Sequence, residues 1–103
     1  METIHPSLSV SRETIAEFCR KWQIIEFALF GSAARGELRP DSDIDVMVQF
    51  APEARHGLYE LVDIQAELEA MFERRVDVAE KGTIRNPYRL QSIDRDLTVL
   101  YAA

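Results

Sequence analysis

The sequence predicts an α/β (α+β) fold, in which a small twisted mixed β-sheet has helices packed mainly on one side. Several short segments alternate apolar and polar residues with period two, which is typical of strands with one buried face. Two longer segments repeat apolar residues at helical spacing instead. The chain has 103 residues, 47% of them hydrophobic, which suffices for one modest core. We therefore expect a single domain over residues 1–103.

The first expected element is an amphipathic helix over residues 11–22. Its apolar stripe consists of Ile15, Phe18, Cys19 and Trp22. Cys19 is therefore expected to be buried, and a single cysteine excludes an internal disulfide. A strand over residues 24–30 should follow, because apolar side chains occupy every second position there. A short helical turn over 33–35 is expected after that strand.

The remaining expected elements complete the sheet and its helical layer. Residues 44–50 alternate with period two and predict a strand with one buried face. A second amphipathic helix should begin after the loop 52–57, in which His56 is expected to be exposed. Its apolar stripe consists of Leu58, Leu61, Val62, Leu68, Met71 and Phe72. Strands are expected over 76–78 and 97–101, with a short helix over 86–93 between them.

Two aspartates at the start of the 44–50 strand are candidate metal ligands. Asp43 and Asp45 lie two positions apart, so both side chains should point to the face opposite Ile44 and Val46. Their Cα atoms would then be about 6.6 Å apart. Hard divalent cations such as Mg²⁺ bind oxygen ligands, including carboxylates together with substrate phosphates. Taken alone, an Asp-x-Asp motif is more often a solvated strand end.

A Gly-Ser turn about a dozen residues earlier makes the aspartate pair more specific. Gly31 can end the 24–30 strand, because glycine allows backbone angles and close approach that larger residues do not. Ser32 can cap the short helical turn that follows. Free N–H groups at such a helix start form an anion site, to which the Ser32 hydroxyl can add a contact. A phosphate-binding turn near a carboxylate pair indicates metal-assisted nucleotide chemistry.

Three short segments contain these residues, namely Gly31-Ser32, Ala34-Arg35-Gly36 and Ser42-Asp43-Ile44-Asp45. Together they resemble the signature of the DNA polymerase beta-like nucleotidyltransferase superfamily. At this chain length, the sequence is most similar to the minimal nucleotidyltransferase (MNT) branch. That branch consists of small prokaryotic proteins that are usually paired with a HEPN-domain protein in toxin–antitoxin modules. The resemblance implies a nucleotidyltransferase fold and is strongest from residue 27 to residue 48.

The resemblance also implies a set of metal ligands. Asp43 and Asp45 would ligate two Mg²⁺ ions, and a third carboxylate is required on a neighbouring strand. Asp77 is the candidate, because it points opposite to its two valine neighbours. It would ligate the ion nearer the acceptor and help to deprotonate the attacking hydroxyl. Glu80 is a rival with the opposite parity, if the strand extends that far.

The expected reaction transfers AMP from ATP to a hydroxyl of a partner protein and releases pyrophosphate. Gly31 and Ser32 would contact the triphosphate, and Arg35 could neutralise one of its oxygens. By resemblance to the MNT branch, the acceptor is a tyrosine of a HEPN toxin, which makes this chain the antitoxin. Two alternatives remain open. One is an antitoxin that neutralises its toxin by stoichiometric binding, and the other is a small-molecule nucleotidyltransferase of the antibiotic-modifying type.

Charge and composition exclude other classes of function. Twelve Lys and Arg residues against eighteen Asp and Glu residues give a net charge of −6, without a basic stripe. Because nucleic-acid surfaces are normally basic, direct nucleic-acid binding is not expected. No apolar run approaches the roughly 20 residues of a membrane span, and the N-terminus lacks a signal-peptide core, so we expect a cytoplasmic protein. The sequence leaves open whether the chain forms a homo-oligomer or a hetero-oligomer.

Overall fold

The protein is represented by a computed structural model that describes residues 3–5, 8–31, 34, 43–81 and 97–103. In chain order, the helices and strands of these residues are β1 (Thr3–His5), β2 (Leu8–Ser11), α1 (Arg12–Trp22), β3 (Ile24–Phe30), β4 (Ile44–Phe50), α2 (Leu58–Phe72), β5 (Val76–Glu80) and β6 (Thr98–Ala102). The expected helices over 33–35 and 86–93 lie outside the described residues, apart from Ala34 in a turn.

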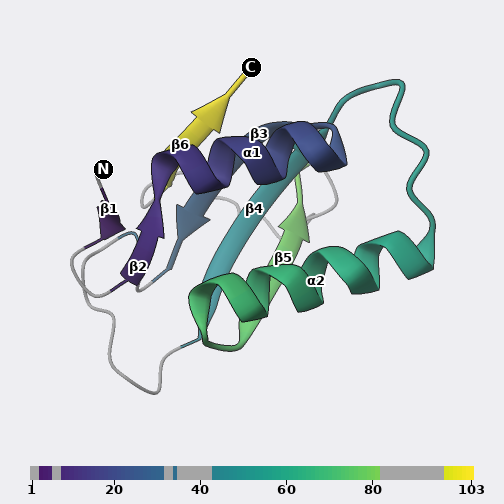
Figure 1. The fold of residues 1–103 in the computed structure, drawn as a ribbon. Coiled ribbons are helices and arrows are strands. Elements are labelled where there is room, and N and C mark those ends of the chain that lie inside the picture. Colours follow the sequence, from purple (N-terminus) through teal and green to yellow (C-terminus); the bar gives the residue numbers. More distant parts are fainter. Residues whose placement is uncertain (1–2, 6–7, 32–33, 35–42, 82–96) are drawn as a thin grey trace.

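Four strands form a mixed sheet in the order β5-β4-β3-β6. β4 and β5 are parallel, whereas β3 is antiparallel to both β4 and β6. Both helices lie on the same face of this sheet (Figure 1). This arrangement confirms the predicted fold class. It also places the starts of β4 and β5 at one end of the sheet, beside the C-terminal end of α2 (Figure 1).

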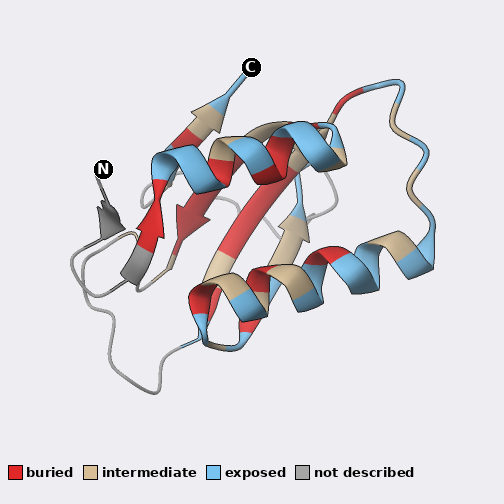
Figure 2. Ribbon diagram, viewed as in Figure 1, coloured by how far each residue is buried: buried red, intermediate tan, exposed pale blue. Residues whose placement is uncertain are grey.

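The main hydrophobic core fills the space between the sheet and the two helices (Figure 2). Its fully buried members are Ile15 and Cys19 of α1, Ile64 and Leu68 of α2, and Ile24, Phe27, Leu29, Ile44, Val46 and Val48 of the central strands. The alternation along β3 and β4 therefore follows from burial of one face under the helices. The prediction that Cys19 is a buried helix residue is confirmed. Burial raises the pKa of its thiol from 9.0 to about 12, although nearby Arg20 acts in the opposite direction.

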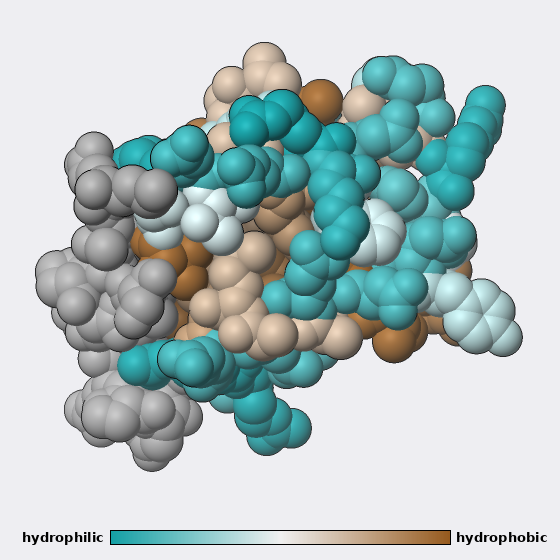
Figure 3. Space-filling model, in the orientation of Figure 1, coloured by the Kyte–Doolittle hydropathy of each residue, from teal (hydrophilic) through white to brown (hydrophobic). Residues whose placement is uncertain are grey.

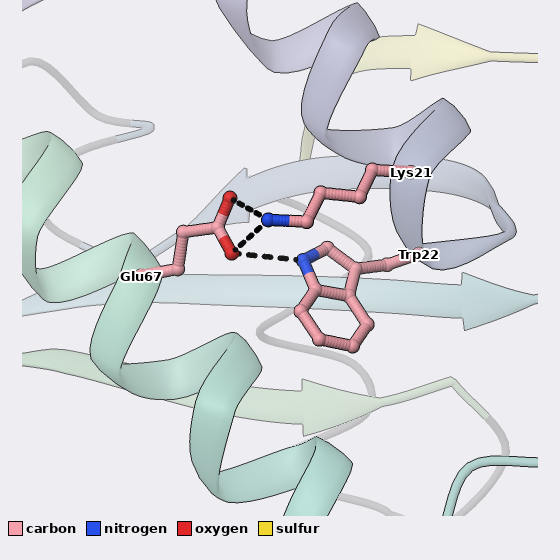
Figure 4. A network of polar contacts seen from close by, with 3 residues as sticks. All are labelled: Lys21, Trp22 and Glu67. Atoms are coloured by element: carbon pink, nitrogen blue, oxygen red, sulfur yellow. Dashed lines mark hydrogen bonds and ion pairs between the residues drawn. The ribbon is translucent and has the colours of Figure 1, made fainter.

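Polar contacts fix both ends of α1. Ser11 caps α1, since its hydroxyl accepts a hydrogen bond of 3.2 Å from the Thr14 N–H. At the other end of α1, Glu67 of α2 accepts hydrogen bonds from the Trp22 indole N–H at 3.1 Å and from Lys21 Nζ at 3.0 Å (Figure 4). These contacts join α1 to α2 above the core. Within the described residues, neither helix is long and apolar enough to cross a membrane.

Two elements near the N-terminus were not predicted. β1 and β2 pair antiparallel and form a separate two-stranded sheet just before α1. They span only three and four residues. Segments this short contain too few positions for a period of two to be recognised.

The structure corrects three expectations about burial. Met47 is buried although it shares a face of β4 with Asp45, because Phe30, Ala79 and Leu97 pack with it into a second small cluster. His56 was expected to be exposed, but it is half-buried. Its ring lies 2.6 Å from the Trp22 carbonyl oxygen and contacts the Trp22 and Phe50 rings edge-on.

The third correction concerns α2. Leu68 and Phe72 are buried, as their helical spacing predicts, and Met71 is half-buried. Leu58, Leu61 and Val62 are exposed instead. They occupy the N-terminal half of the helix, and the buried α2 positions are Ile64, Leu68 and Phe72. Periodicity identified the helix correctly, but it assigned three of its apolar residues to the wrong environment.

Candidate active site

Two parallel strands bring two of the predicted carboxylates side by side. Asp45 of β4 and Asp77 of β5 are direct register partners. Their strand neighbours Ile44, Val46 and Val76 point into the main core. Because side chains alternate along a strand, both aspartates point to the sheet face that the helices do not cover. The prediction that Asp77 lies on the strand next to Asp45 is therefore confirmed.

The third predicted carboxylate, Asp43, lies immediately before β4 and is exposed. Asp43 and Asp77 line one open depression of about 570 Å³. The other lining residues are Gln65, Glu69, Arg75 and Val76. β5 is an edge strand, so a depression at its start can be lined by α2 from one side and by the aspartates from the other. The depression thus gives a ligand access to the start of β4 and β5.

Gly31 lies directly against the carboxylate of Asp45. Phe30, the last residue of β3, is the register partner of Asp45, which places Gly31 beside it. The backbone of Gly31 has a φ of +70°, a left-handed conformation that other residues adopt only at a cost. A Cβ atom built at Gly31 would overlap Oδ2 of Asp45. Glycine is therefore required here for both its conformation and its lack of a side chain.

Glu69 and Arg75 belong to the site, although the sequence did not identify them. Glu69 of α2 accepts a hydrogen bond of 3.1 Å from the backbone N–H of Val76. The carbonyl of Arg75 accepts one of 2.9 Å from the N–H of Ile44. These bonds fix the start of β5 against α2 and against β4. Arg75 also lines the depression together with Asp43, Glu69 and Asp77.

Two predicted nucleotide-binding residues, Ser32 and Arg35, lie outside the described residues. The rival carboxylate Glu80 lies within them. β5 extends as far as Glu80, so its parity relative to Asp77 is opposite. Glu80 lines a different depression, of about 320 Å³, together with His56 and Phe50 at the other end of β4. The arrangement favours Asp77 as the partner of Asp45.

The donor set suits a divalent cation that binds together with a ligand. Among the described residues, no group of three or more His, Cys, Asp or Glu side chains is arranged to hold a metal ion by itself. Asp45 and Asp77 nevertheless place two carboxylates on adjacent strands. Mg²⁺ is usually bound by one or two carboxylates, with waters and substrate phosphates completing its shell. These residues therefore fit Mg²⁺ bound with a nucleotide.

Sequence comparison identifies relatives among archaeal proteins. The chain is 40% identical over 77 residues to MJ1379 of Methanocaldococcus jannaschii, a candidate protein adenylyltransferase, covering 75% of this chain and 77% of that protein. It is 30% identical over 86 residues to the protein adenylyltransferase MntA of Thermococcus cleftensis, covering 84% and 82% respectively.

Solved structures share the fold. A candidate minimal nucleotidyltransferase has a TM-score of 0.68 and 29% identity, covering 84% of this chain and 86% of that one. A toxin–antitoxin crystal structure with AMP-PNP has a TM-score of 0.72 and 19% identity, covering 91% and 75%. A complex of a tri-AMPylated Shewanella oneidensis HEPN toxin with an MNT antitoxin has a TM-score of 0.63 and 17% identity, covering 89% and 70%. At 17–19% identity, the last two show the fold alone.

The family assignment rests on most of the chain. The model of the family described as Nucleotidyltransferase domain matches residues 11–100, a range that includes Gly31, Asp43, Asp45 and Asp77. The match and the named relatives confirm the resemblance to minimal nucleotidyltransferases and the prediction of an enzyme of the nucleotidyltransferase class. This chain therefore belongs to the Nucleotidyltransferase domain family.

Proposed function

We propose that this chain is a metal-dependent protein adenylyltransferase that transfers AMP from ATP to a tyrosine of a HEPN toxin and thereby acts as its antitoxin. The observation that carries the proposal is the pairing of Asp45 with Asp77 across β4 and β5, with Gly31 pressed against Asp45. Relatives named protein adenylyltransferases support the choice of AMP as the transferred group. The tyrosine acceptor rests on the resemblance to the MNT branch.

Asp43 and Asp45 are the proposed ligands of two Mg²⁺ ions, and Asp77 is the proposed ligand nearer the acceptor. When bound, Mg²⁺ neutralises the charge of the triphosphate and stabilises the attacking and leaving oxygens. Asp43 is exposed and lines the open depression, so a triphosphate could reach it there. Gly31 offers its backbone without the obstruction of a side chain. Ser32 and Arg35 are proposed as further phosphate contacts.

In the proposed reaction, the acceptor oxygen attacks the α-phosphorus of ATP. A new P–O bond joins AMP to the acceptor, while the bond between the α-phosphorus and the bridging oxygen breaks and pyrophosphate leaves. The acceptor hydroxyl loses its proton, and Asp77 is the group proposed to receive it. Asp77 is exposed and lines the open depression, so an acceptor on another protein can approach it. The chain thus supplies positioning and charge, which account for most of the catalysis in phosphoryl transfer.

A protein acceptor suits the properties of this chain. Its net charge of −6 disfavours nucleic-acid substrates. A HEPN toxin is the proposed partner because it is the AMPylated component of the complex with an MNT antitoxin noted above. The cytoplasm is the proposed location. A reaction that consumes ATP is compatible with it, and so is a cysteine that is free and buried.

The test is intact mass spectrometry of the protein encoded beside this chain, which the proposal expects to be a HEPN toxin, after incubation with the chain, ATP and Mg²⁺. We expect a gain of one or more AMP units that disappears when Mg²⁺ is chelated. Tandem mass spectrometry then identifies the modified residue, and the proposal expects a tyrosine. An unchanged mass in the presence of a stable complex would contradict catalysis and favour neutralisation by stoichiometric binding.

A further inference from the structure

The N-terminal half of α2 exposes large apolar side chains to solvent. The exposed fractions are 75% for Leu58, 86% for Tyr59 and 58% for Val62. With the exposed Ala66, one turn further on, they form what we call the α2 patch. Figure 3 shows apolar side chains at the surface over this helix, among hydrophilic ones. Contiguous exposed apolar side chains mark interaction sites more often than isolated ones do.

The α2 patch continues into the candidate active site. Leu58, Val62, Gln65 and Glu69 recur at i, i+4, i+7 and i+11, so they follow one line along the helix. Val62, Ala66, Gln65 and Glu69 line a shallow depression of about 290 Å³. Gln65 and Glu69 also line the larger depression that contains Asp43 and Asp77. A rise of 1.5 Å per residue makes this path about 16 Å long from Leu58 to Glu69.

The charges around the α2 patch indicate what kind of surface it fits. α2 contains the acidic residues Glu60, Asp63, Glu67 and Glu69 and no Lys or Arg. Glu67 is held by Lys21 and Trp22 on the α1 side (Figure 4). Asp63 is exposed beside the patch. A second copy of this chain would bring acidic residues against acidic residues, which costs free energy.

We propose that the α2 patch is the docking surface for the acceptor protein, and that the acceptor presents an apolar face flanked by Lys or Arg side chains. This inference rests on the proposed protein adenylyltransferase function. The partner would contact the N-terminal half of α2 and place its hydroxyl residue at Asp77, in the depression that Glu69 also lines. The patch would then fix the position of the acceptor relative to the carboxylates.

The test compares a double variant of the patch, Tyr59→Ser with Val62→Ser, with the control Val99→Ser. Val99 is also apolar and 41% exposed, but it lies on β6 at the opposite edge of the sheet. Calorimetry measures the affinity for the HEPN-domain partner and, separately, for AMP-PNP with Mg²⁺. We expect the patch variant to bind the partner at least about tenfold more weakly, because buried apolar anchors dominate interfaces. AMP-PNP binding should not change, and Val99→Ser should match the wild type in both measurements.

Asp63→Lys tests the charge argument separately. It should slow association with the partner, and the difference from the wild type should shrink at high salt. Partner affinity within twofold of wild type for the patch variant would overturn the docking surface, even if AMP transfer is observed. A dimer of the isolated chain that the patch variant dissociates would also overturn it, in favour of a second copy. If the patch variant loses affinity but the wild type transfers no AMP, the docking surface stands and the adenylyltransferase function fails.

Discussion

The two faces of β4 differ in what their residues do. On the face beneath the helices, Ile44, Val46 and Val48 are at most 1% exposed and belong to the main core. On the other face, Asp45 is half-buried and pairs with Asp77 at the start of the strand. Residues that are adjacent in the sequence therefore lie in opposite environments.

This difference predicts that stability and activity can be separated within a few residues. Substitutions on the helix-covered face should lower the free energy of unfolding and leave the chemistry of each folded molecule intact. Substitutions on the carboxylate face should lower the transfer rate and leave folding largely intact. The second face is not entirely polar. Met47, which lies further along β4 than Asp45, packs with Phe30 of β3. The predicted catalytic region is therefore confined to the start of the strand.

The largest expected effect is that of Asp45→Asn. The substitution keeps the size of the side chain and one oxygen, but it removes the charge proposed to hold Mg²⁺. We expect the rate of AMP transfer to fall by about 1,000-fold or more, which corresponds to a loss of about 4 kcal/mol of transition-state stabilisation. The measurement is the initial rate of transfer to the HEPN-domain partner. Glu17→Gln on the exposed side of α1 makes the same change of charge and should keep the wild-type rate.

Gly31→Ala should lower both stability and activity, with a somewhat smaller loss of activity than Asp45→Asn. The added Cβ would overlap Oδ2 of Asp45 and would occupy a left-handed conformation. We expect a stability loss of about 1–2 kcal/mol from the backbone. The transfer rate should fall by about 100-fold, because a catalytic group is displaced. Urea denaturation measures the stability loss, and initial rates measure the loss of activity. A fully active variant would contradict the claim that activity depends on the position of the Asp45 carboxylate beside Gly31.

Ile44→Val tests the helix-covered face with a single methylene. Ile44 is fully buried, so the deletion should lower the free energy of unfolding by about 0.5–1.5 kcal/mol. Because Ile44 lies between Asp43 and Asp45, the same variant shows whether the carboxylates tolerate a small change in the core. We expect the rate per folded molecule to stay within twofold of the wild type. A loss comparable to that of Asp45→Asn would show that the two faces are not separable.

The expected effect that is smallest at neutral pH concerns the Cys19 thiol, whose titration reports how well the core excludes water. Its pKa is raised from 9.0 to about 12 by burial, so the folded state favours the neutral thiol. The contribution to stability is complete below pH 9 and is lost as the pH rises from 9 to 12. The difference between the unfolding free energies of the wild type and of Cys19→Ala should be constant below pH 9 and should shrink only as the pH rises above it. A native thiol that iodoacetamide alkylates readily at pH 8 would contradict its burial.

The sequence was most informative where burial repeats regularly. Period-two and helical spacing located β3, β4 and β5 and both helices, because a face buried under another layer must be apolar at each turn or pleat. The same spacing assigned Leu58 and Val62 of α2 to the core, although they are exposed. Periodicity identifies which side chains share a face, but it does not show how far along that face the core extends.

The site was predictable in part, for related reasons. Asp43, Asp45 and Gly31 lie close together in the sequence, so their spacing alone indicated a site. The alternation of Asp77 with valines predicted only which face of its strand it occupies, and its register opposite Asp45 is known from the strand pairing in the structure. Glu69 could not be found in this way. Its role depends on a hydrogen bond to the edge of β5, and nothing in the α2 sequence indicates that contact.

The most direct test of the central claim requires no partner protein. Calorimetry can measure the binding of AMP-PNP to the wild type, Asp45→Asn and Ile44→Val, each with Mg²⁺ and with a chelator. We predict binding that depends on Mg²⁺ in the wild type and in Ile44→Val, and that is lost in Asp45→Asn. Equal affinity in all three proteins, or affinity independent of Mg²⁺, would contradict the claim that the carboxylate face of β4 binds a metal–nucleotide complex.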